Sequence, residues 1–387
     1  MRRLLPWVLA LLLVAMPVLA EDEGEDDFSM ADILSDASEE VREQIVSTTV
    51  TDDGTIIEEI EEVPVFEDDG SILITVTATG DFTIGGDSRK SSSIFAKELK
   101  KRGGDPNYTL ANVRDILMDD DLTIVNFEGT LTDSTYVPSK KKNNDFLFSA
   151  PPSYASILSD NGVEAVSLEN NHVLDHGEDA YQDTKDALDS VGVVWSNSET
   201  VGVIEVKGVQ IAMLSYLCID RWDTLWTKVP EDIKAAKEQY PIVIVSFHWG
   251  YEKDYAPRDN QIKMGRLAVD SGADLVLGHH SHRINPIELY NGVYICYSLG
   301  NFCFAGNNKP DDMNSYIFQT RFRIRDGEGV SSEGFRIIPI SISSSTNYND
   351  FQPTVLTKET TIDSILSTLK SNGKKLAYAV EEYPTEW

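Results

Sequence analysis

All six histidines of the 387-residue sequence lie at or just after the end of an apolar run: His172, His176, His248, His279, His280 and His282. Asp81, Glu128 and Asn171 end similar runs. Imidazole nitrogens and carboxylate or amide oxygens are common ligands of divalent ions, and no cysteine stands among these residues. The residue types therefore predict a pocket for one or two divalent ions (Mn, Fe, Zn or Mg). Two such ions can assist displacement at a phosphoryl group.

Each of these segments also has a purely structural alternative. Asp81 and Glu128 could be turn or helix-capping acids. Asn171 could form an Asx-turn, and His248 could pack beside a core tryptophan. The segment Gly278–His282, with three histidines in four positions, is the strongest signal for a site. We favour the site because the structural alternatives would have to hold independently on five different strand ends.

Five apolar runs that end at these residues are predicted to be buried strands: 72–79, 122–128, 164–172, 242–248 and 274–279. Helical patterns lie between them, at 110–118, 152–159, 178–191 and 260–270. Alternating strands and helices predict an α/β fold with a largely parallel sheet. Residues 287–342 suggest an antiparallel second sheet or edge. Because ligands bind beyond the carboxyl ends of such strands, the polar residues are expected to share one pocket.

Composition limits the classes of function. The formal net charge of −31 repels nucleic acid and anionic headgroups, so a nucleic-acid-binding role is excluded. The basic run Lys140–Lys142 is interpreted as a solvated loop, with steering of an anionic ligand as the alternative. Cys218, Cys296 and Cys303 are too few for a disulfide scaffold and are expected to be buried thiols. Pairing of Cys296 with Cys303 remains open.

The two ends of the chain differ from its centre. Arg2 and Arg3 precede an apolar run at 4–20, which predicts a signal peptide or N-terminal anchor over residues 1–20, with cleavage and retention both open. Residues 21–70 carry 20 acidic side chains and one basic one, which predicts an acidic, mostly disordered linker. The main domain is expected at 71–345. Residues 346–387 are expected to form a tail with one closing helix.

Six motifs, in this order and at comparable spacing, resemble the CapA-type capsule-synthesis family. They are Thr79-Gly80-Asp81, Asn126-Phe127-Glu128, Asn170-Asn171-His172 with Asp175, His248-Trp249-Gly250, Gly278-His279-His280-Ser281-His282 and Tyr297-Ser298-Leu299-Gly300-Asn301-Phe302. The family is associated with poly-γ-glutamate capsule synthesis, and its domain is similar to calcineurin-like metallophosphoesterases. The resemblance implies a layered α/β fold with mixed β-sheets flanked by helices.

The resemblance also implies roles for individual residues. The implied metal ligands are Asp81, Glu128, Asn171, His248, His279 and His282. His172 is expected to be the catalytic general acid, a role that imidazole suits near neutral pH. His280, Asp175 and Asn301 rank lower as site residues. Metallophosphoesterases open with Asp-x-His, whereas Asp81-Phe82-Thr83 lacks that histidine, so one metal position is expected to be weaker, differently ligated or empty.

Two functions follow from these expectations. The first is an exported, extracellular or cell-surface metal-dependent hydrolase that acts on a phosphoester or an anionic, amide-linked polymer. The second is a non-catalytic, polymer-handling component of a capsule-synthesis or export complex at the membrane. A serine hydrolase is disfavoured, because no Gly-x-Ser-x-Gly motif occurs.

Overall fold

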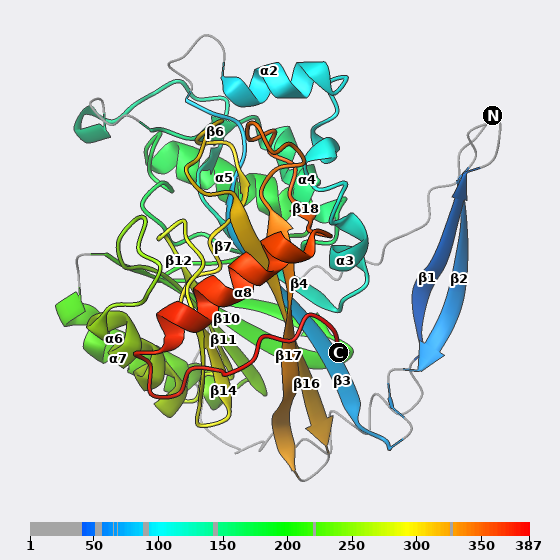
Figure 1. Cartoon of the computed structure of the whole chain (residues 1–387), viewed down its shortest axis with the longest axis vertical. Coiled ribbons are helices and arrows are strands. Elements are labelled where there is room, and N and C mark those ends of the chain that lie inside the picture. The colour runs from blue at the N-terminus through cyan, green and yellow to red at the C-terminus, as the bar shows by residue number, and fades with distance from the viewer. Residues whose placement is uncertain are drawn as a thin grey trace, which may run out of the picture.

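The structure is a computed structural model of the chain. It describes residues 41–50, 56–64, 66–67, 69–87, 93–141, 146–219, 222–325 and 328–387, and for residues 41–64 only the backbone. The predicted signal peptide or anchor at 1–20 lies outside these residues, as does the first part of the predicted linker. The described part of that linker contains a hairpin of β1 (Val41–Val50) and β2 (Ile56–Pro64) (Figure 1). The domain limits stay predictions.

The larger of the two main sheets has eight strands, in the order β18-β17-β16-β3-β4-β7-β8, with β15 beside β3. Their bounds are β3 Ile72–Thr83, β4 Leu122–Phe127, β7 Ala165–Ser167, β8 Val194–Ser196, β15 Asn301–Phe304, β16 Asn314–Arg325, β17 Gly329–Ser341 and β18 Thr354–Val355. Strands β3, β4, β7, β8 and β15 are parallel, whereas β16, β17 and β18 add antiparallel strands at one edge.

The second main sheet has six strands, in the order β13-β14-β12-β11-β10-β9. Their bounds are β9 Gly202–Val206, β10 Val209–Cys218, β11 Ile242–Trp249, β12 Leu275–His279, β13 Ile287–Tyr290 and β14 Val293–Cys296. The four central strands are parallel, and β9 and β13 are antiparallel at the two edges. Strands β5 (Thr130–Leu131) and β6 (Ser149–Ala150) form a separate two-stranded sheet.

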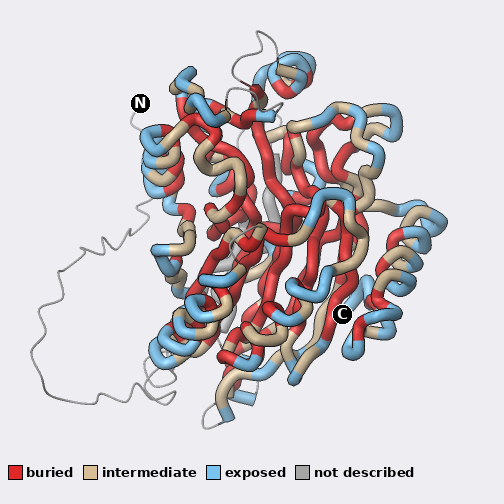
Figure 2. The backbone as a smooth tube through the Cα atoms, turned by 90° about the vertical axis from the view of Figure 1, so that its left-hand side faces the viewer, coloured by how far each residue is buried: buried red, intermediate tan, exposed pale blue. Residues whose placement is uncertain are grey.

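The core lies in three layers, because alternate residues of a strand point to opposite faces. In β11, Ile242 and Ile244 join a cluster that both sheets share, whereas Val243, Val245 and Phe247 join a cluster on the outer face. The shared cluster holds the two sheets face to face. Figure 2 shows the strands buried along most of their length and the helices exposed on their outer sides.

Helices cover the outer faces of both sheets. The larger sheet packs against α2 (Ile94–Lys101), α3 (Arg114–Met118), α4 (Ser156–Ser159) and α5 (Glu178–Ser190), and the smaller one against α6 (Trp222–Lys237) and α7 (Asp259–Asp270). The last helix, α8 (Glu359–Gly373), places Ile365 and Leu369 in the cluster shared by the sheets. Among the described residues, no helix has the length and apolar character that a membrane span requires.

The α/β class with mixed sheets flanked by helices is confirmed, and each of the five predicted strands is present. The prediction of a single, largely parallel sheet is wrong, because the five strands divide between two sheets. The segment 287–342, expected to form one second sheet or edge, contributes strands to both. Cys218, Cys296 and Cys303 are buried thiols, as expected, and the pairing of Cys296 with Cys303 that the sequence left open is not formed.

A buried ion pair holds the C-terminal segment against the smaller sheet. Glu288 is fully buried, and its carboxylate accepts hydrogen bonds from Arg266 at 2.6 and 3.1 Å, from the Tyr297 hydroxyl at 2.7 Å and from the Tyr378 backbone N–H at 3.2 Å. Removing one charge from a buried pair leaves the other uncompensated.

Glu288→Gln is therefore expected to lower the free energy of unfolding by about 3 kcal/mol. Urea denaturation measures this loss. The matched control is Glu382→Gln, which breaks the exposed pair with Lys370 and should change stability by less than about 1 kcal/mol. Equal losses for the two variants would contradict the prediction.

Candidate metal centre

The predicted ligands lie where the carboxyl ends of strands from both sheets meet. Asp81, in β3, pairs with Asn126 of β4, and the β3–β4 register shifts between Ala78 and Asp81. Such irregularities re-aim side chains and are frequent beside functional sites. In the other sheet, His248 of β11 pairs directly with His279 of β12. One pair of neighbouring strands from each sheet thus supplies the centre of the site.

The closest donor groups come from Asp81, Glu128 and His282. One ligand atom from each of these residues lies within 4.8 Å of the other two. The Asp81 Oδ2 is 3.0 Å from His282 Nδ1, and its Oδ1 is 3.6 Å from His279 Nδ1. On the other side of the imidazole, His282 Nε2 is 4.0 Å from Glu128 Oε1. Three donor groups at this spacing could hold a metal ion.

An amide that sequence reasoning left without a role links this group to His248. Asn126 Nδ2 donates to Asp81 Oδ1 at 2.8 Å and lies 3.3 Å from His248 Nδ1. His248 Nε2 in turn lies 2.7 Å from Asn171 Oδ1. The signal for Asn126 was present in the sequence as the one amide in a strand whose other residues are apolar apart from Thr123.

His172 approaches Glu128 from a separate chain of contacts. Its Nε2 is 3.6 Å from Glu128 Oε1, and its Nδ1 is 2.7 Å from Asp175 Oδ2. The Lys141 ammonium donates to Asp175 Oδ1 at 2.9 Å and to the Asn171 carbonyl at 2.8 Å. The expectation of a solvated Lys140–Lys142 loop is therefore wrong for Lys141, whose side chain is only 16% exposed.

The lower-ranked residues divide into two groups. Asn301 Oδ1 is 2.9 Å from His282 Nδ1, and the His280 ring is 4.6 Å from the His248 ring, so both adjoin the cluster. His280 and His282 have φ of 88° and 53°, a left-handed conformation that is uncommon outside glycine and recurs at functional sites. His176 instead contacts the backbone carbonyl of Tyr136 at 2.8 Å.

The motifs that form this cluster also match a known sequence family. The model of the family described as "Bacterial capsule synthesis protein PGA_cap" matches residues 75–306, more than half of the chain. The chain belongs to this PGA_cap family. The match includes every predicted site residue, from Asp81 to Asn301.

Curated relatives agree with this assignment. The chain is 29% identical to "PGA biosynthesis protein CapA" of Bacillus subtilis (strain 168), over 82% of this chain and 84% of that protein. It is 28% identical to "Capsule biosynthesis protein CapA" of Bacillus anthracis, over 60% of each chain. A "Probable polyglutamine synthesis accessory protein" of Mycobacterium tuberculosis is 27% identical, over 58% of this chain and 66% of that protein.

Among solved structures, the NAD nucleotidase of Haemophilus influenzae aligns with a TM-score of 0.39 and 11% identity, over 78% of this chain and 63% of that one. A likeness of this size says nothing about the chemistry of the site.

Burial and the charges of neighbouring side chains shift the pKa values of the histidines in this PGA_cap site. Burial lowers the pKa of His279 and His280 to about 4, and burial with the neighbouring imidazoles holds the pKa of His248 well below its usual value. His282 is the exception: although burial opposes it, Glu128 and Asp81 raise its pKa to about 9. The neutral imidazoles at 248 and 279 are in the state that binds metal ions.

The surroundings of the Glu128 carboxylate indicate whether the site fits a cation. Its pKa is raised to about 7 by burial and by the charge of Asp81. It is 1% exposed, and within the described part of the chain neither of its carboxylate oxygens has a hydrogen-bond partner. His282 and His172 lower the pKa of Glu128, but its net shift is still upward, so the buried carboxylate is destabilising unless a further positive group compensates it. A divalent ion among Asp81, Glu128 and His282 would do so, and the oxygen and nitrogen donors suit such an ion.

The structure thus brings together all the residues that the sequence singled out as ligands, and it adds Asn126 and Lys141 to the residues around them. That the predicted ligands coordinate a metal stays a prediction.

Proposed function

We propose that this PGA_cap protein is a divalent-metal-dependent hydrolase that acts in capsule or poly-γ-glutamate synthesis. The observation that carries the proposal is the buried Glu128 carboxylate, which has no hydrogen-bond partner among the described residues and faces Asp81 and His282. A carboxylate in such a position is useful when it holds a cation, and it destabilises the fold otherwise. The identity of the ion among Mn, Fe, Zn and Mg is left open by the donor set.

The metal ligands in this proposal are Asp81, Glu128, Asn171, His248, His279 and His282. An ion held there would polarise a phosphoryl or acyl oxygen of the substrate. Asn126 orients Asp81 by donating to its Oδ1.

The proton would be supplied by His172. The Asp175 carboxylate lies 2.7 Å from His172 Nδ1, and this contact fixes the orientation of the imidazole ring. The other ring nitrogen, Nε2, then faces the cluster. This nitrogen is placed to deliver a proton to the leaving oxygen or nitrogen. Lys141 and the backbone N–H of Phe148 hold the Asp175 carboxylate in place.

The substrate class comes from the relatives and from charge. The Bacillus relatives are named for PGA or capsule biosynthesis, so an anionic polymer or a phosphoester is the proposed substrate. A cation is needed to hold such a substrate on a chain with a net charge of −31. Export, a cell-surface location and work beside a membrane complex for capsule synthesis are part of the same proposal.

One observation favours a second function, polymer handling without turnover. Thr83 stands where metallophosphoesterases carry the histidine of Asp-x-His, and its buried hydroxyl has no hydrogen-bond partner among the described residues. One imidazole is therefore lacking from that side of the cluster.

Metal removal and return tests both functions. We expect chelated protein to regain at least one equivalent of Mn, Fe, Zn or Mg, and to rise in melting temperature as it does so, because an ion that binds only the folded state stabilises it. Turnover is measured with p-nitrophenyl phosphoesters and with poly-γ-glutamate. Metal binding with turnover supports the hydrolase, and metal binding without turnover supports polymer handling. Failure to bind any of the four ions contradicts both.

A further inference from the structure

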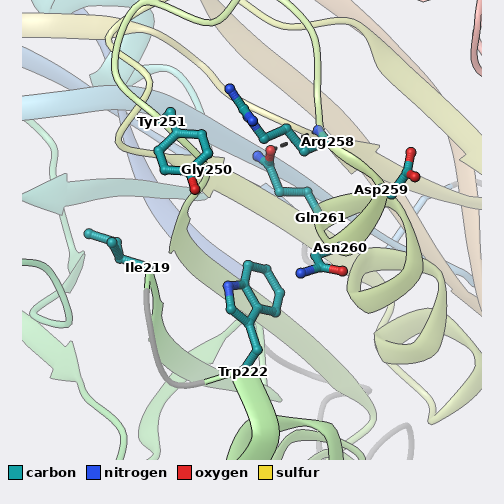
Figure 3. A pocket seen from close by; sticks show the side chains of 8 residues that line it. All are labelled: Ile219, Trp222, Gly250, Tyr251, Arg258, Asp259, Asn260 and Gln261. Carbon is teal, nitrogen blue, oxygen red and sulfur yellow. Dashed lines mark hydrogen bonds between the residues drawn. The ribbon is translucent and has the colours of Figure 1, made fainter.

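A second cavity opens at the carboxyl ends of β10 and β11, beside the metal cluster in sequence but built from other side chains. Its volume is about 460 Å³, within the range of small-ligand pockets. Gly250, two residues after His248, forms part of its wall. Trp222 of α6 and Asn260 and Gln261 of α7 line it as well (Figure 3). None of these residues has a role in the proposed hydrolysis.

Two aromatic rings lie on different sides of this cavity. Figure 3 shows Trp222 rising from α6 and Tyr251 on the loop after β11. The Trp222 ring is 5.8 Å from the ring of Trp226, and the Arg258 guanidinium lies 3.9 Å from the centre of the Tyr251 ring. These contacts hold both rings in place, although Tyr251 is 56% exposed. An exposed aromatic ring that is held in place by a neighbouring group can offer a stacking surface to a ligand.

The polar groups around the rings include the amides of Asn260 and Gln261, and the charge of Arg258 is already balanced. Arg258 donates from Nε to Asp254 at 2.7 Å. Gln261 is buried, and its Oε1 accepts from the Arg258 backbone N–H at 2.9 Å, which fixes its amide at the cavity. In Figure 3 the Asp259 carboxylate points away from the space between the rings. The space between the rings is therefore lined by amide donors and acceptors, with the Asp259 carboxylate directed away from it.

Gly250 keeps this space open. Its φ of 87° is in the left-handed region, and a Cβ there would lie 2.8 Å from Gln261 Nε2. Any side chain at this position would push against the amide and enter the cavity.

We infer that this cavity is a subsite for a neutral pyranose unit of a glycan. The two faces of a pyranose ring carry C–H groups that stack on aromatic rings, and its hydroxyls pair with amides such as those of Gln261 and Asn260. An acidic polymer is disfavoured, because Arg258 is already paired with Asp254. A nucleic acid is disfavoured by the net charge of −31. The protein would thus hold a glycan next to the site where the proposed hydrolysis occurs.

The test is a titration of the full chain with two neutral β1,4-linked tetrasaccharides, one of glucose and one of N-acetylglucosamine. Binding is measured by tryptophan fluorescence and by calorimetry. Saturable binding is expected with at least one of them. Trp222→Ala and Tyr251→Ala should each weaken it at least tenfold, and Gly250→Ala should block it. Circular dichroism and melting temperature show whether each variant is folded.

Tyr378→Ala is the matched control, since Tyr378 is also exposed and has the Arg266 guanidinium 5.0 Å from its ring. It should leave sugar binding unchanged, as should Glu128→Gln in the metal cluster. Three results would overturn the inference. The first is that neither sugar binds saturably, and the second is sugar binding that survives Trp222→Ala. The third is binding of poly-γ-glutamate that is lost in both Trp222→Ala and Arg258→Gln, which would assign the cavity to an acidic polymer.

Discussion

Glu128→Gln is expected to abolish metal-stimulated hydrolysis while leaving the metal-free protein at least as stable as the unsubstituted chain. The carboxylate has no hydrogen bond within the described residues to lose, and burial beside Asp81 raises its pKa to about 7. A raised pKa in the folded state means that ionisation opposes folding as the pH rises through 7, and glutamine removes this penalty. The loss in turnover should be at least about a hundredfold, or about 2.7 kcal/mol in the activation free energy.

Three measurements check this prediction: turnover with and without added ion, bound metal, and urea denaturation of chelated protein at pH 8. The control is Glu98→Gln. Glu98 is also buried, but Lys101 and Arg102 donate to it at 2.6 and 3.3 Å. Its replacement should reduce stability and leave metal binding intact. A Glu128→Gln protein that binds and uses metal normally would contradict the proposed centre.

Gly278→Ala is expected to damage stability severely, with a loss of at least about 3 kcal/mol. The Trp249 indole N–H donates to the Tyr297 carbonyl at 2.8 Å, directly across Gly278. A Cβ at 278 would lie 2.2 Å from that carbonyl oxygen and 2.7 Å from the indole nitrogen. Since the oxygen belongs to buried backbone, neither neighbour can move aside cheaply. Thermal and urea denaturation, or recovery of soluble protein, measures the effect.

The control separates atomic overlap from backbone strain. Gly292, in the turn between β13 and β14, has a φ of 83°, but a Cβ added there would meet no atom within 4 Å. Gly292→Ala should therefore lose only about 1 kcal/mol, the usual penalty for a left-handed residue. If Gly278→Ala were no worse than Gly292→Ala, the close approach of Trp249 and Tyr297 would be refuted.

Local patterns were sufficient to predict the strands. The run from Ile72 to Thr79 is apolar or β-branched throughout, and it forms most of β3. Which strands pair with which is a different question. β16 pairs with β3, matching Ile324 with Ile72, although some 250 positions separate them. No local pattern encodes such a long-range choice, so the division of the strands between two sheets could not be predicted.

The site shows the same limit. Asp81, Glu128, His248 and His279 were found because the strand-end rule needs only the end of an apolar run. Lys141 was misinterpreted because its contact with Asp175 spans 34 positions and joins two loops. In the sequence, nothing distinguishes it from its neighbours in a basic triplet.

The face-to-face packing of the two sheets has a consequence for the choice of ion in the proposed metal centre. Asp81 belongs to one sheet and His279 to the other, and their separation depends on the apolar layer between the sheets, including Val76 and Leu277. In the proposed metal centre, the distance between these two ligands would thus depend on residues that are not ligands themselves. Removing a methyl group from that apolar layer would then shift the preference among ions of different radius while every proposed ligand stays in place.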